Sequence, residues 1–306
     1  MRERKHTSMP SVSVIVPAYN SERYVQRCIE GLLEQTYPSS AYEIVMVDNN
    51  STDRSREIIR SYPRIRLILE PKQGSYAARN HGVRVSDGEV LVFTDSDCVP
   101  SSCWLVELLK PFVTPEICIV QGARKFARDS ATLSMLATYD AERAANTFSP
   151  VGVGSQYGYT NNMAVRREVF DRCGPFLEIP RGADSLFVDR VVAAYSHDAV
   201  RYAPDASIRH LEITSVWQWL RKRAIYGRSY QLMLGHRESY RGMTLEQGKQ
   251  IFERTIERGG YSWAEIKLLI LLGRMAGICF KCGQSAGRWQ ATGQRAWKLL
   301  RTVSRD

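Results

Sequence analysis

The first hundred residues alternate short β-branched runs with stretches of helical periodicity, and this alternation constrains the fold more than any other feature of the chain. Runs such as residues 13–17, 43–47 and 90–94 are apolar except for one terminal residue each, as is typical of strands buried on both faces of a parallel sheet. Strands that alternate with helices predict parallel βαβ units. The fold class that we expect is therefore α/β, a doubly wound, mostly parallel sheet flanked by helices.

The same patterns continue along the chain, where helical stretches become longer towards the C-terminus. The expected strands are 13–17, 43–47, 66–69, 90–94, 117–121 and 162–166. The expected helices include a first one capped by Asn20 or Ser21, a second ending near residue 61, and 76–85, 104–112, 167–173, 184–195, 216–234 and 245–258.

Composition indicates a globular protein of a reducing compartment. Of the 306 residues 44% are hydrophobic and 24% charged, which argues against disorder. The seven cysteines have irregular spacing, so they do not form a disulfide framework. Residues 1–10 are basic and polar and have no apolar signal-peptide core. We therefore expect an N-terminal tail at 1–10 and a cytoplasmic location.

Positive charge is concentrated in the last third of the chain. Residues 216–306 hold 17 Lys and Arg against 6 Asp and Glu, whereas residues 1–215 hold 25 against 26. This asymmetry predicts an anionic partner. Residues 266–280 are largely apolar but contain Lys267 and Arg274, and they are shorter than the roughly 20 residues that span a bilayer. We expect a core helix or an in-plane helix there, and peripheral association of residues 216–306 with the cytoplasmic face of an anionic membrane.

Polar clusters follow three of the expected strands. They are Pro17-Ala18-Tyr19-Asn20, the segment 48–53 and Asp95-Ser96-Asp97, and the ends of parallel strands meet at one sheet edge. Carboxylates there suit Mg²⁺ or Mn²⁺, which bind substrate phosphates. Arg79, near the start of a helix, can meet a diphosphate.

Each cluster also has a simpler interpretation. Residues 17–20 are typical of a plain strand–turn–helix connection, and Asp48 of a helix cap. Arg79 is compatible with a surface ion pair, and Asp95-Ser96-Asp97 with a solvated loop. Their joint placement at one sheet edge favours a ligand site.

The blocks around these clusters resemble, in order, those of family 2 glycosyltransferases over roughly residues 11–230. No single block is specific, but together they are. The matching blocks are 13–20, 47–53, 78–82, 93–97, 160–167 and 181–184.

The resemblance implies a GT-A fold, with a nucleotide-sugar half at about 11–100 and an acceptor half at about 101–215, and a nucleotide-sugar donor, commonly a UDP-sugar. Asp48 would accept from the base, Arg79 would face the phosphates, and Asp95 and Asp97 would hold a Mn²⁺ or Mg²⁺ ion. That cation and the arginines would stabilise the departing diphosphate. The residues assigned to the nucleotide are Pro17, Ala18, Tyr19, Asn20, Asp48, Arg79, Asp95 and Ser96.

Asp184 is the general base that the resemblance implies, deprotonating an acceptor hydroxyl that attacks opposite the leaving group. Asn161, Asn162 and Arg181 fall on the acceptor side. Many relatives have Glu-Asp where this chain has Ala183-Asp184, which puts a neighbouring acceptor contact in doubt. Asp184 is also placed to cap a helix, and both roles are compatible.

Two further assignments stay open. His210 is a third metal ligand or a structural histidine at a strand end. Arg223 and Arg228, with Arg221, either close over the diphosphate or form a solvated or lipid-facing basic surface.

We expect a metal-dependent inverting glycosyltransferase that acts on a hydroxyl of a lipid-linked or growing glycan. Transfer to a polyprenyl phosphate is the alternative, and that anionic acceptor hardly needs a base. A sugar-nucleotidyltransferase would need a Gly-rich loop where residues 17–20 stand. A non-enzymic nucleic-acid-binding protein would leave Asp95 and Asp97 unexplained, so we expect no nucleic-acid partner.

Overall fold

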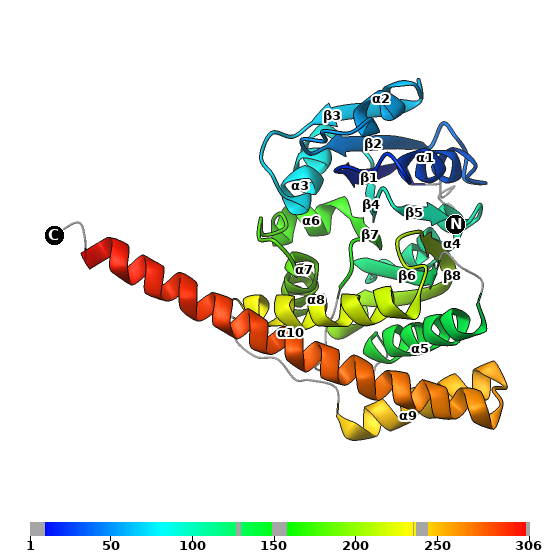
Figure 1. Cartoon of the computed structure of the whole chain (residues 1–306). Coiled ribbons are helices and arrows are strands. Elements are labelled where there is room, and N and C mark those ends of the chain that lie inside the picture. Colours follow the sequence, from blue (N-terminus) through cyan, green and yellow to red (C-terminus); the bar gives the residue numbers. More distant parts are fainter. Residues whose placement is uncertain (1–9, 127–129, 149–157, 235, 237–243, 304–306) are drawn as a thin grey trace.

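The computed structural model describes residues 10–126, 130–148, 158–234, 236 and 244–303, apart from the side chains of Leu232 and of residues 289–303. The predicted tail at 1–10 lies, except for Pro10, outside the described residues. Figure 1 shows a sheet covered by helices on both faces, with a group of longer helices at one end.

Within the described residues, eight strands form one sheet in the order β3-β2-β1-β4-β7-β6-β8-β5. The first four are parallel to one another, β6 is parallel to β8, and β7 and β5 run antiparallel to their neighbours. The expected class, a mostly parallel sheet flanked by helices, is confirmed. The strands are β1 (Val12–Ala18), β2 (Tyr42–Asp48), β3 (Ile65–Leu69), β4 (Val90–Thr94), β5 (Cys98–Pro100), β6 (Ile119–Phe126), β7 (Asn162–Arg166) and β8 (Val200–His210).

Helices cover the two faces of the sheet because its strands are apolar on both sides. On one face Val14, Val16 and Met46 pack against α1, α2 and α4, and on the other Ile15 and Phe93 pack against α3, α6 and α7. The helices are α1 (Val25–Leu33), α2 (Ser55–Arg60), α3 (Ser75–Val85), α4 (Trp104–Leu109), α5 (Ala131–Thr147), α6 (Arg167–Cys173), α7 (Ala183–Ala194), α8 (Val216–Leu234), α9 (Leu245–Gly259) and α10 (Trp263–Val303).

The sequence patterns did not predict three of the elements, namely β5, β8 and α5. β8 is interrupted by Pro204 and Asp205, where its pairing with β6 shifts register, so it lacks a continuous strand pattern. The first helix also differs from expectation. It begins at Val25 without a side-chain cap, because the backbone carbonyl of Ser21 accepts from the N–H groups of Tyr24 and Val25 instead.

The C-terminal helices share a core with α5. Trp219 and Leu220 of α8 pack with Leu272 and Ala276 of α10, and with Leu136 of α5. Within the described part of the chain, no helix is long and apolar enough to cross a membrane.

Glycines allow α8 and α10 to cross with their backbones in contact. A Cβ at Gly283 would lie 1.9 Å from the carbonyl oxygen of Ala224, and one at Gly227 would lie 2.0 Å from that of Phe280. Only glycine fits these two positions. The crossing therefore fixes α10 against α8.

We expect Gly283→Ala to destabilise the protein by roughly 1–3 kcal/mol, because the methyl group meets rigid backbone. Gly273→Ala, on the same helix but with nothing within 4 Å, is the matched control and should gain up to about 1 kcal/mol from helix propensity. Urea unfolding of both variants measures the difference. Equal stabilities would contradict the close crossing.

Candidate active site

The candidate site lies at the carboxyl edge of the parallel strands. β1 pairs with both β2 and β4, and Ala18 at the end of β1 lies opposite Asp48 at the end of β2. The polar clusters that follow these three strands therefore meet at one edge, as the sequence predicts.

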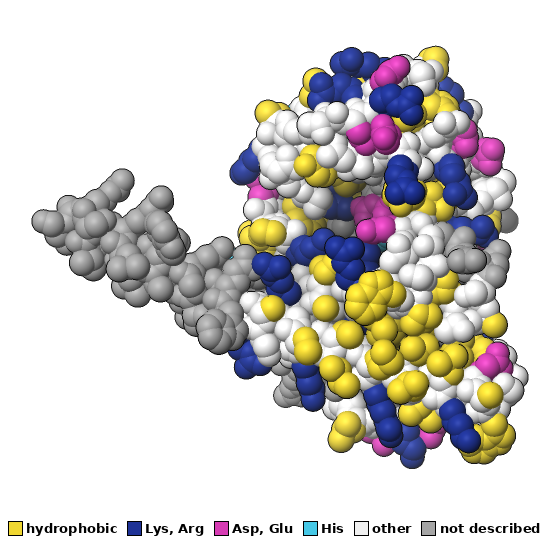
Figure 2. Space-filling model, in the orientation of Figure 1, with side chains coloured by type: hydrophobic (Ala, Val, Ile, Leu, Met, Phe, Trp, Pro, Cys, Tyr) yellow, Lys and Arg dark blue, Asp and Glu magenta, His cyan; other side chains and the backbone are white. Residues whose placement is uncertain are grey.

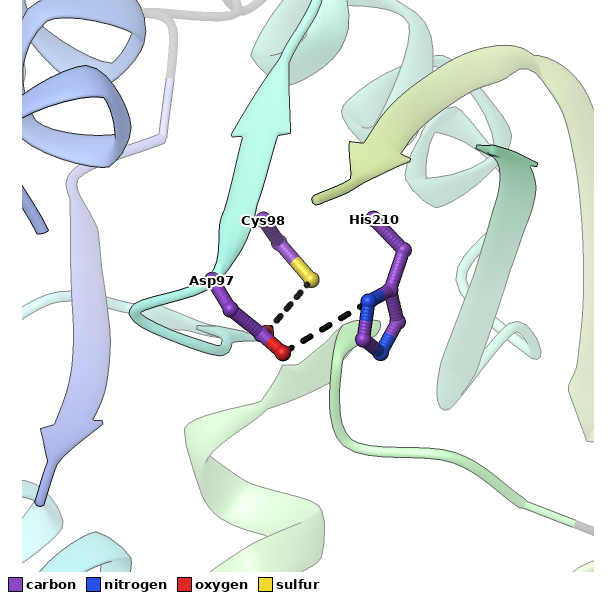
Figure 3. A group of neighbouring side chains, drawn as sticks. All are labelled: Asp97, Cys98 and His210. Carbon is purple, nitrogen blue, oxygen red and sulfur yellow. Dashed lines mark hydrogen bonds and ion pairs between the residues drawn. The ribbon is translucent and has the colours of Figure 1, made fainter. Parts of the chain in front are cut away.

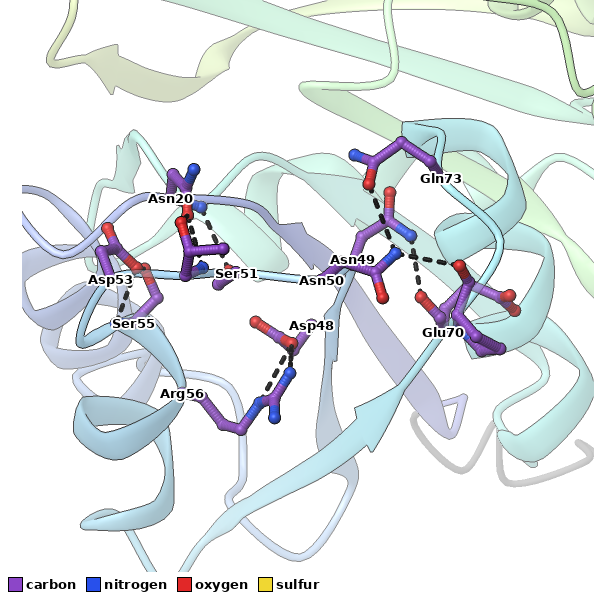
Figure 4. Close-up of polar contacts among 12 residues, drawn as sticks. Asn20, Asp48, Asn49, Asn50, Ser51, Asp53, Ser55, Arg56, Glu70 and Gln73 are labelled. Carbon is purple, nitrogen blue, oxygen red and sulfur yellow. Dashed lines mark hydrogen bonds and ion pairs between the residues drawn. The ribbon is translucent and has the colours of Figure 1, made fainter.

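Asp48 is a buried carboxylate with one oxygen unused. Its Oδ2 accepts hydrogen bonds from Arg56 Nε at 3.2 Å and Nη2 at 2.7 Å, whereas Oδ1 is buried with no hydrogen-bond partner (Figure 4). An unpaired buried polar atom is costly, so such atoms usually have a function. Oδ1 is available to accept from an N–H group of a ligand. The helix-cap alternative does not apply, because α2 begins at Ser55.

Asparagines tie the surrounding loops together. Asn20, with a left-handed φ of 46°, accepts at Oδ1 from the backbone N–H of Thr52 at 2.8 Å. Asn49 donates to the carbonyl oxygens of Glu70 and Lys72 at 2.9 and 2.8 Å. This network joins the loops after β1, β2 and β3 (Figure 4). Beside it, Pro17 is partly buried, Ala18 is fully buried, and the Tyr19 side chain is 54% exposed.

Arg79 of α3 is buried and forms an ion pair with Asp95 Oδ1. With an exposed fraction of only 4%, it is not the surface pair that the simpler interpretation required. Its Nε is buried without a hydrogen-bond partner. Ser96, between the two carboxylates, is buried as well. A cationic group with an unused donor is thus held next to the end of β4.

Asp97, Cys98 and His210 form a cluster that fits a metal ion (Figure 3). His210, at the end of β8, pairs in register with Cys98 of β5, which brings its Nδ1 to 3.5 Å from Asp97 Oδ2. Burial, with a smaller contribution from nearby Lys222, lowers the pKa of His210 to about 4, so its imidazole is neutral near pH 7, as a metal ligand must be.

The donor set of this cluster favours a hard cation. Burial and the charge of Asp97 raise the pKa of the Cys98 thiol well above its usual range, so the thiol stays protonated and donates to Asp97 Oδ1 at 3.4 Å. A protonated thiol is a poor ligand, so the carboxylate and the imidazole are the stronger donors, and this pair suits Mn²⁺ better than a metal that selects thiolates. Asp95, whose Oδ1 is held by Arg79, is not part of the cluster.

Asp184 occupies the first turn of α7, held by backbone N–H groups. Its Oδ1 accepts from Ser185 N at 2.9 Å and its Oδ2 from Thr160 N at 3.3 Å. Burial raises the pKa of the Asp184 carboxyl, although the Ser185 N–H and the charge of Arg79 oppose the shift. A carboxylate with a raised pKa is a stronger base.

The turn before α7 is positioned by Tyr76 and Gly182. The Tyr76 hydroxyl accepts from the N–H of Gly182 at 3.2 Å. Gly182 has a φ of 89°, and an added Cβ there would lie 2.4 Å from Met233 of α8. The turn that precedes Asp184 therefore lies between α3 and the end of α8.

Among the acceptor-side candidates, the two asparagines differ sharply. Asn161 is buried with Oδ1 unpartnered. Asn162 is fully buried, and its amide donates to Ala123 O and Ala206 O at 2.7 and 2.9 Å. Asn162 thus has no hydrogen left to donate to an acceptor. Arg181 is exposed, and its charge is felt by Glu212.

Of the three arginines of α8, Arg223 and Arg228 do not make an evident phosphate contact. Arg223 Nη2 contacts Asp140 of α5 at 2.6 and 2.5 Å and its guanidinium lies over the Trp219 ring, so it joins two helices. Arg228 is exposed, and its backbone oxygen lies at the α8–α10 crossing, against Gly287.

Sequence reasoning missed Lys222 and Glu212 beside the metal cluster. Lys222 Nζ pairs with Glu212 at 2.6 Å, and its charge opposes the rise that burial causes in the pKa of Asp97. Helical spacing from Trp219 places Lys222, like Arg223, on the inward side of this helix, whereas Arg221 is exposed. Its proximity to Asp97 has no signal in the local sequence.

Residues 13–174 match the family model described as Glycosyl transferase family 2. The chain belongs to this family. Glycosyltransferase AglE of Haloferax volcanii is 32% identical over 214 residues, which are 65% of this chain and 68% of that protein. The family assignment drawn from the sequence blocks is confirmed.

Solved structures show the same GT-A fold. The mannosyltransferase PcManGT of Pyrobaculum calidifontis, in complex with GDP-Man and Mn²⁺, has a TM-score of 0.60 at 21% identity, over 93% of this glycosyltransferase and 85% of that chain. Glucosyl-3-phosphoglycerate synthase of Mycobacterium tuberculosis, with Mn²⁺, UDP-glucose and phosphoglyceric acid, has a TM-score of 0.50 at 16% identity, over 83% and 81% of the two chains.

Proposed function

We propose that this glycosyltransferase moves a sugar from a nucleotide-sugar, with a UDP-sugar as the expected donor, to a hydroxyl group with inversion at the anomeric carbon. One observation carries the proposal. A single sheet edge presents a buried unpaired oxygen of Asp48, a buried guanidinium of Arg79, and the neighbouring Asp97 and His210. These groups match the base, the diphosphate and the cation of a bound donor.

Asp97 and His210 would hold the divalent cation, with Asp95 beside them. When bound, the cation offsets the negative charge that builds on the departing diphosphate. Arg79 adds a fixed positive charge at the same place, since it is oriented by Asp95. The Mn²⁺ in the complexes of the two structural relatives supports this assignment.

Asp184 would take the proton of the acceptor hydroxyl. Its two oxygens are aligned by the N–H groups of Ser185 and Thr160, so the carboxylate is oriented before the acceptor arrives. Attack from the side opposite the diphosphate then inverts the configuration of the transferred sugar. A polyprenyl phosphate acceptor would not need this proton transfer.

For the acceptor we propose a lipid-linked or growing glycan. The excess of positive charge in residues 216–306 supports an acceptor that is presented at an anionic membrane.

A donor panel tests the proposed function. UDP- and GDP-sugars are offered with Mn²⁺, with and without a lipid extract as acceptor, and release of the nucleoside diphosphate is measured. We expect release with one class of donor, increased by the extract. No release from any donor, by a protein that still binds Mn²⁺, would contradict the proposal.

The nucleotide pocket has its own test. Asp48→Ala should weaken binding of the preferred nucleoside diphosphate about 10-fold or more, because a hydrogen bond to a buried charged group is lost. Calorimetry with UDP and GDP measures the affinity. Glu57→Ala, on the exposed side of α2, is the control. If both variants bind the nucleoside diphosphate with equal affinity, Asp48 does not contact the nucleotide.

A further inference from the structure

Helix α10 carries a stripe of exposed basic and apolar side chains at regular spacing. Lys267, Arg274, Lys281 and Arg288 recur every seven residues and are all exposed. Because seven residues are nearly two helical turns, these positions lie along one side of the helix. The first three, Lys267, Arg274 and Lys281, are the basic half of the stripe.

Apolar side chains fill the turns between them. Leu271 and Ile278 stand four residues after Lys267 and Arg274, and their exposed fractions are 54% and 62%. Met275 and Ile270, at the borders of the stripe, are also exposed. We call the exposed residues Lys267, Ile270, Leu271, Arg274, Met275, Ile278 and Lys281 the α10 stripe.

The α10 stripe contains no negative charge. Glu265 is the one acidic residue between 263 and 288, and its carboxylate accepts from the N–H and hydroxyl of Ser262 at the start of the helix. Among the described residues, no ion pair involves Lys267, Arg274 or Lys281. The stripe thus offers uncompensated positive charge next to exposed apolar surface.

Further exposed aromatic residues lie near the ends of the helices concerned. Trp217, at the start of α8, is 72% exposed, and Trp263, at the start of α10, is 78% exposed. Figure 2 shows hydrophobic side chains gathered over α8 and α10 in the lower half of one face, with Lys and Arg among them. Exposed tryptophans are typical of side chains that sit at the lipid headgroup level.

We infer that the α10 stripe, with Trp217 and Trp263, is the surface on which the protein docks to an anionic phospholipid bilayer. Charge complementarity argues for this occupant. A bilayer surface supplies anionic headgroups for the cations and an acyl boundary for the apolar side chains, which lie in the plane between them.

A second copy of the chain is a poorer fit. In a twofold dimer the same surface meets itself, so the basic side chains of one helix would face those of the other. Like charges in such an interface are destabilising. The stripe therefore lacks the self-complementarity that a dimer needs.

Docking on the α10 stripe would orient the active site. Helix α10 is fixed to α8 at Gly227 and Gly283, and α8 carries Lys222 beside the metal cluster. Figure 2 shows a hollow on the same face above the hydrophobic patch, where Figure 1 places the ends of β4 and β5. The stripe would turn this hollow towards the bilayer. This orientation, which rests on the proposed function, delivers a lipid-linked acceptor to the metal cluster and Asp184.

Vesicle co-sedimentation of the full chain tests the docking surface. Vesicles of phosphatidylcholine alone, or with about a third phosphatidylglycerol, are used at about 0.1 M and about 0.5 M NaCl. The wild-type chain should bind the anionic vesicles and be only partly released by the higher salt, because its apolar side chains also contribute. The triple variant Lys267→Glu/Arg274→Glu/Lys281→Glu should bind the anionic vesicles at least about 10-fold more weakly than the wild type does.

Two further variants make the result specific. Arg23→Glu/Arg27→Glu/Arg60→Glu changes the charge equally at exposed sites on the nucleotide half and should bind nearly as well as wild type. Leu271→Ser/Ile278→Ser should still bind the anionic vesicles at the lower salt concentration, but the higher salt concentration should release this variant from them completely. Circular dichroism and the nucleotide release with soluble donor, measured without vesicles, should be unchanged in all variants.

The inference is overturned if the stripe variants bind anionic vesicles as the wild type does. It is also overturned if the wild type does not bind the vesicles but sediments as a dimer, and the same substitutions dissociate that dimer. Because nucleotide release without vesicles is measured separately, failure of docking and failure of the proposed glycosyl transfer give different results.

Discussion

Replacing Asp97 by alanine should lower nucleotide release and sugar transfer by at least about 100-fold, the largest loss that we expect from a single change. The Asp97 carboxylate lies 3.5 Å from His210, and without it the proposed cation would lose its charged ligand in the turn between β4 and β5. The loss should be accompanied by weaker Mn²⁺ binding in calorimetry, a readout that does not depend on turnover. Treatment of the wild type with EDTA should have the same effect and be reversed by added Mn²⁺.

A matched surface change separates this effect from general damage. Asp198→Ala removes an exposed carboxylate that pairs with Arg201 of the following strand, and it should leave both turnover and Mn²⁺ binding unchanged. His210→Ala should resemble Asp97→Ala in Mn²⁺ binding. Full turnover of the wild type in EDTA would refute the metal assignment.

Replacing Asp184 by asparagine should lower transfer to a hydroxyl acceptor by about 10²- to 10⁴-fold, the contribution of a general base. Asparagine keeps the size of the side chain but cannot take a proton. Donor binding should change little, because the assigned nucleotide contacts come from other residues. Asp171→Asn, an exposed position on α6, is the control. Full activity of Asp184→Asn would instead favour the polyprenyl phosphate acceptor.

The pH dependence of the wild type gives an independent view of Asp184. Burial raises the pKa of its carboxyl, and the base must be ionised to act. The rate should therefore fall as the pH falls through this raised pKa, which places the acidic limb of kcat/KM at a higher pH than an ordinary aspartate would. Asp184→Asn should lose this limb. A limb that persists in the variant would belong to another group.

Sequence patterns were sufficient for residues 11–100 because the signals of these elements are local. Strands buried on both faces are continuously apolar, and helical spacing follows each of them, so β1 to β4 and their helices could be predicted to within a few residues. Asp48 ends β2 and Asp95 directly follows β4, and topology alone brings such positions to one edge. Four of the six family blocks lie in the same local segments.

The tertiary structure decided what depends on residues far apart in the sequence. β5 and β8 pair across the sheet and set His210 beside Asp97, although Pro204 breaks the strand pattern of β8. Asp140 of α5 forms an ion pair with Arg223. This arginine is therefore no longer an evident candidate for a phosphate contact.

Which side of α10 is exposed was likewise decided by the tertiary structure. The sequence by itself determined the positive charge of the last third and the apolar character of residues 266–280. It did not determine which residues of that helix pack and which face solvent. Leu269, Leu272 and Ala276 are buried against α5 and α8, whereas Leu271 and Ile278 are exposed. The burial of a side chain on a helix depends on which other element packs against that side of the helix. Which element packs there depends on the tertiary structure of the whole chain.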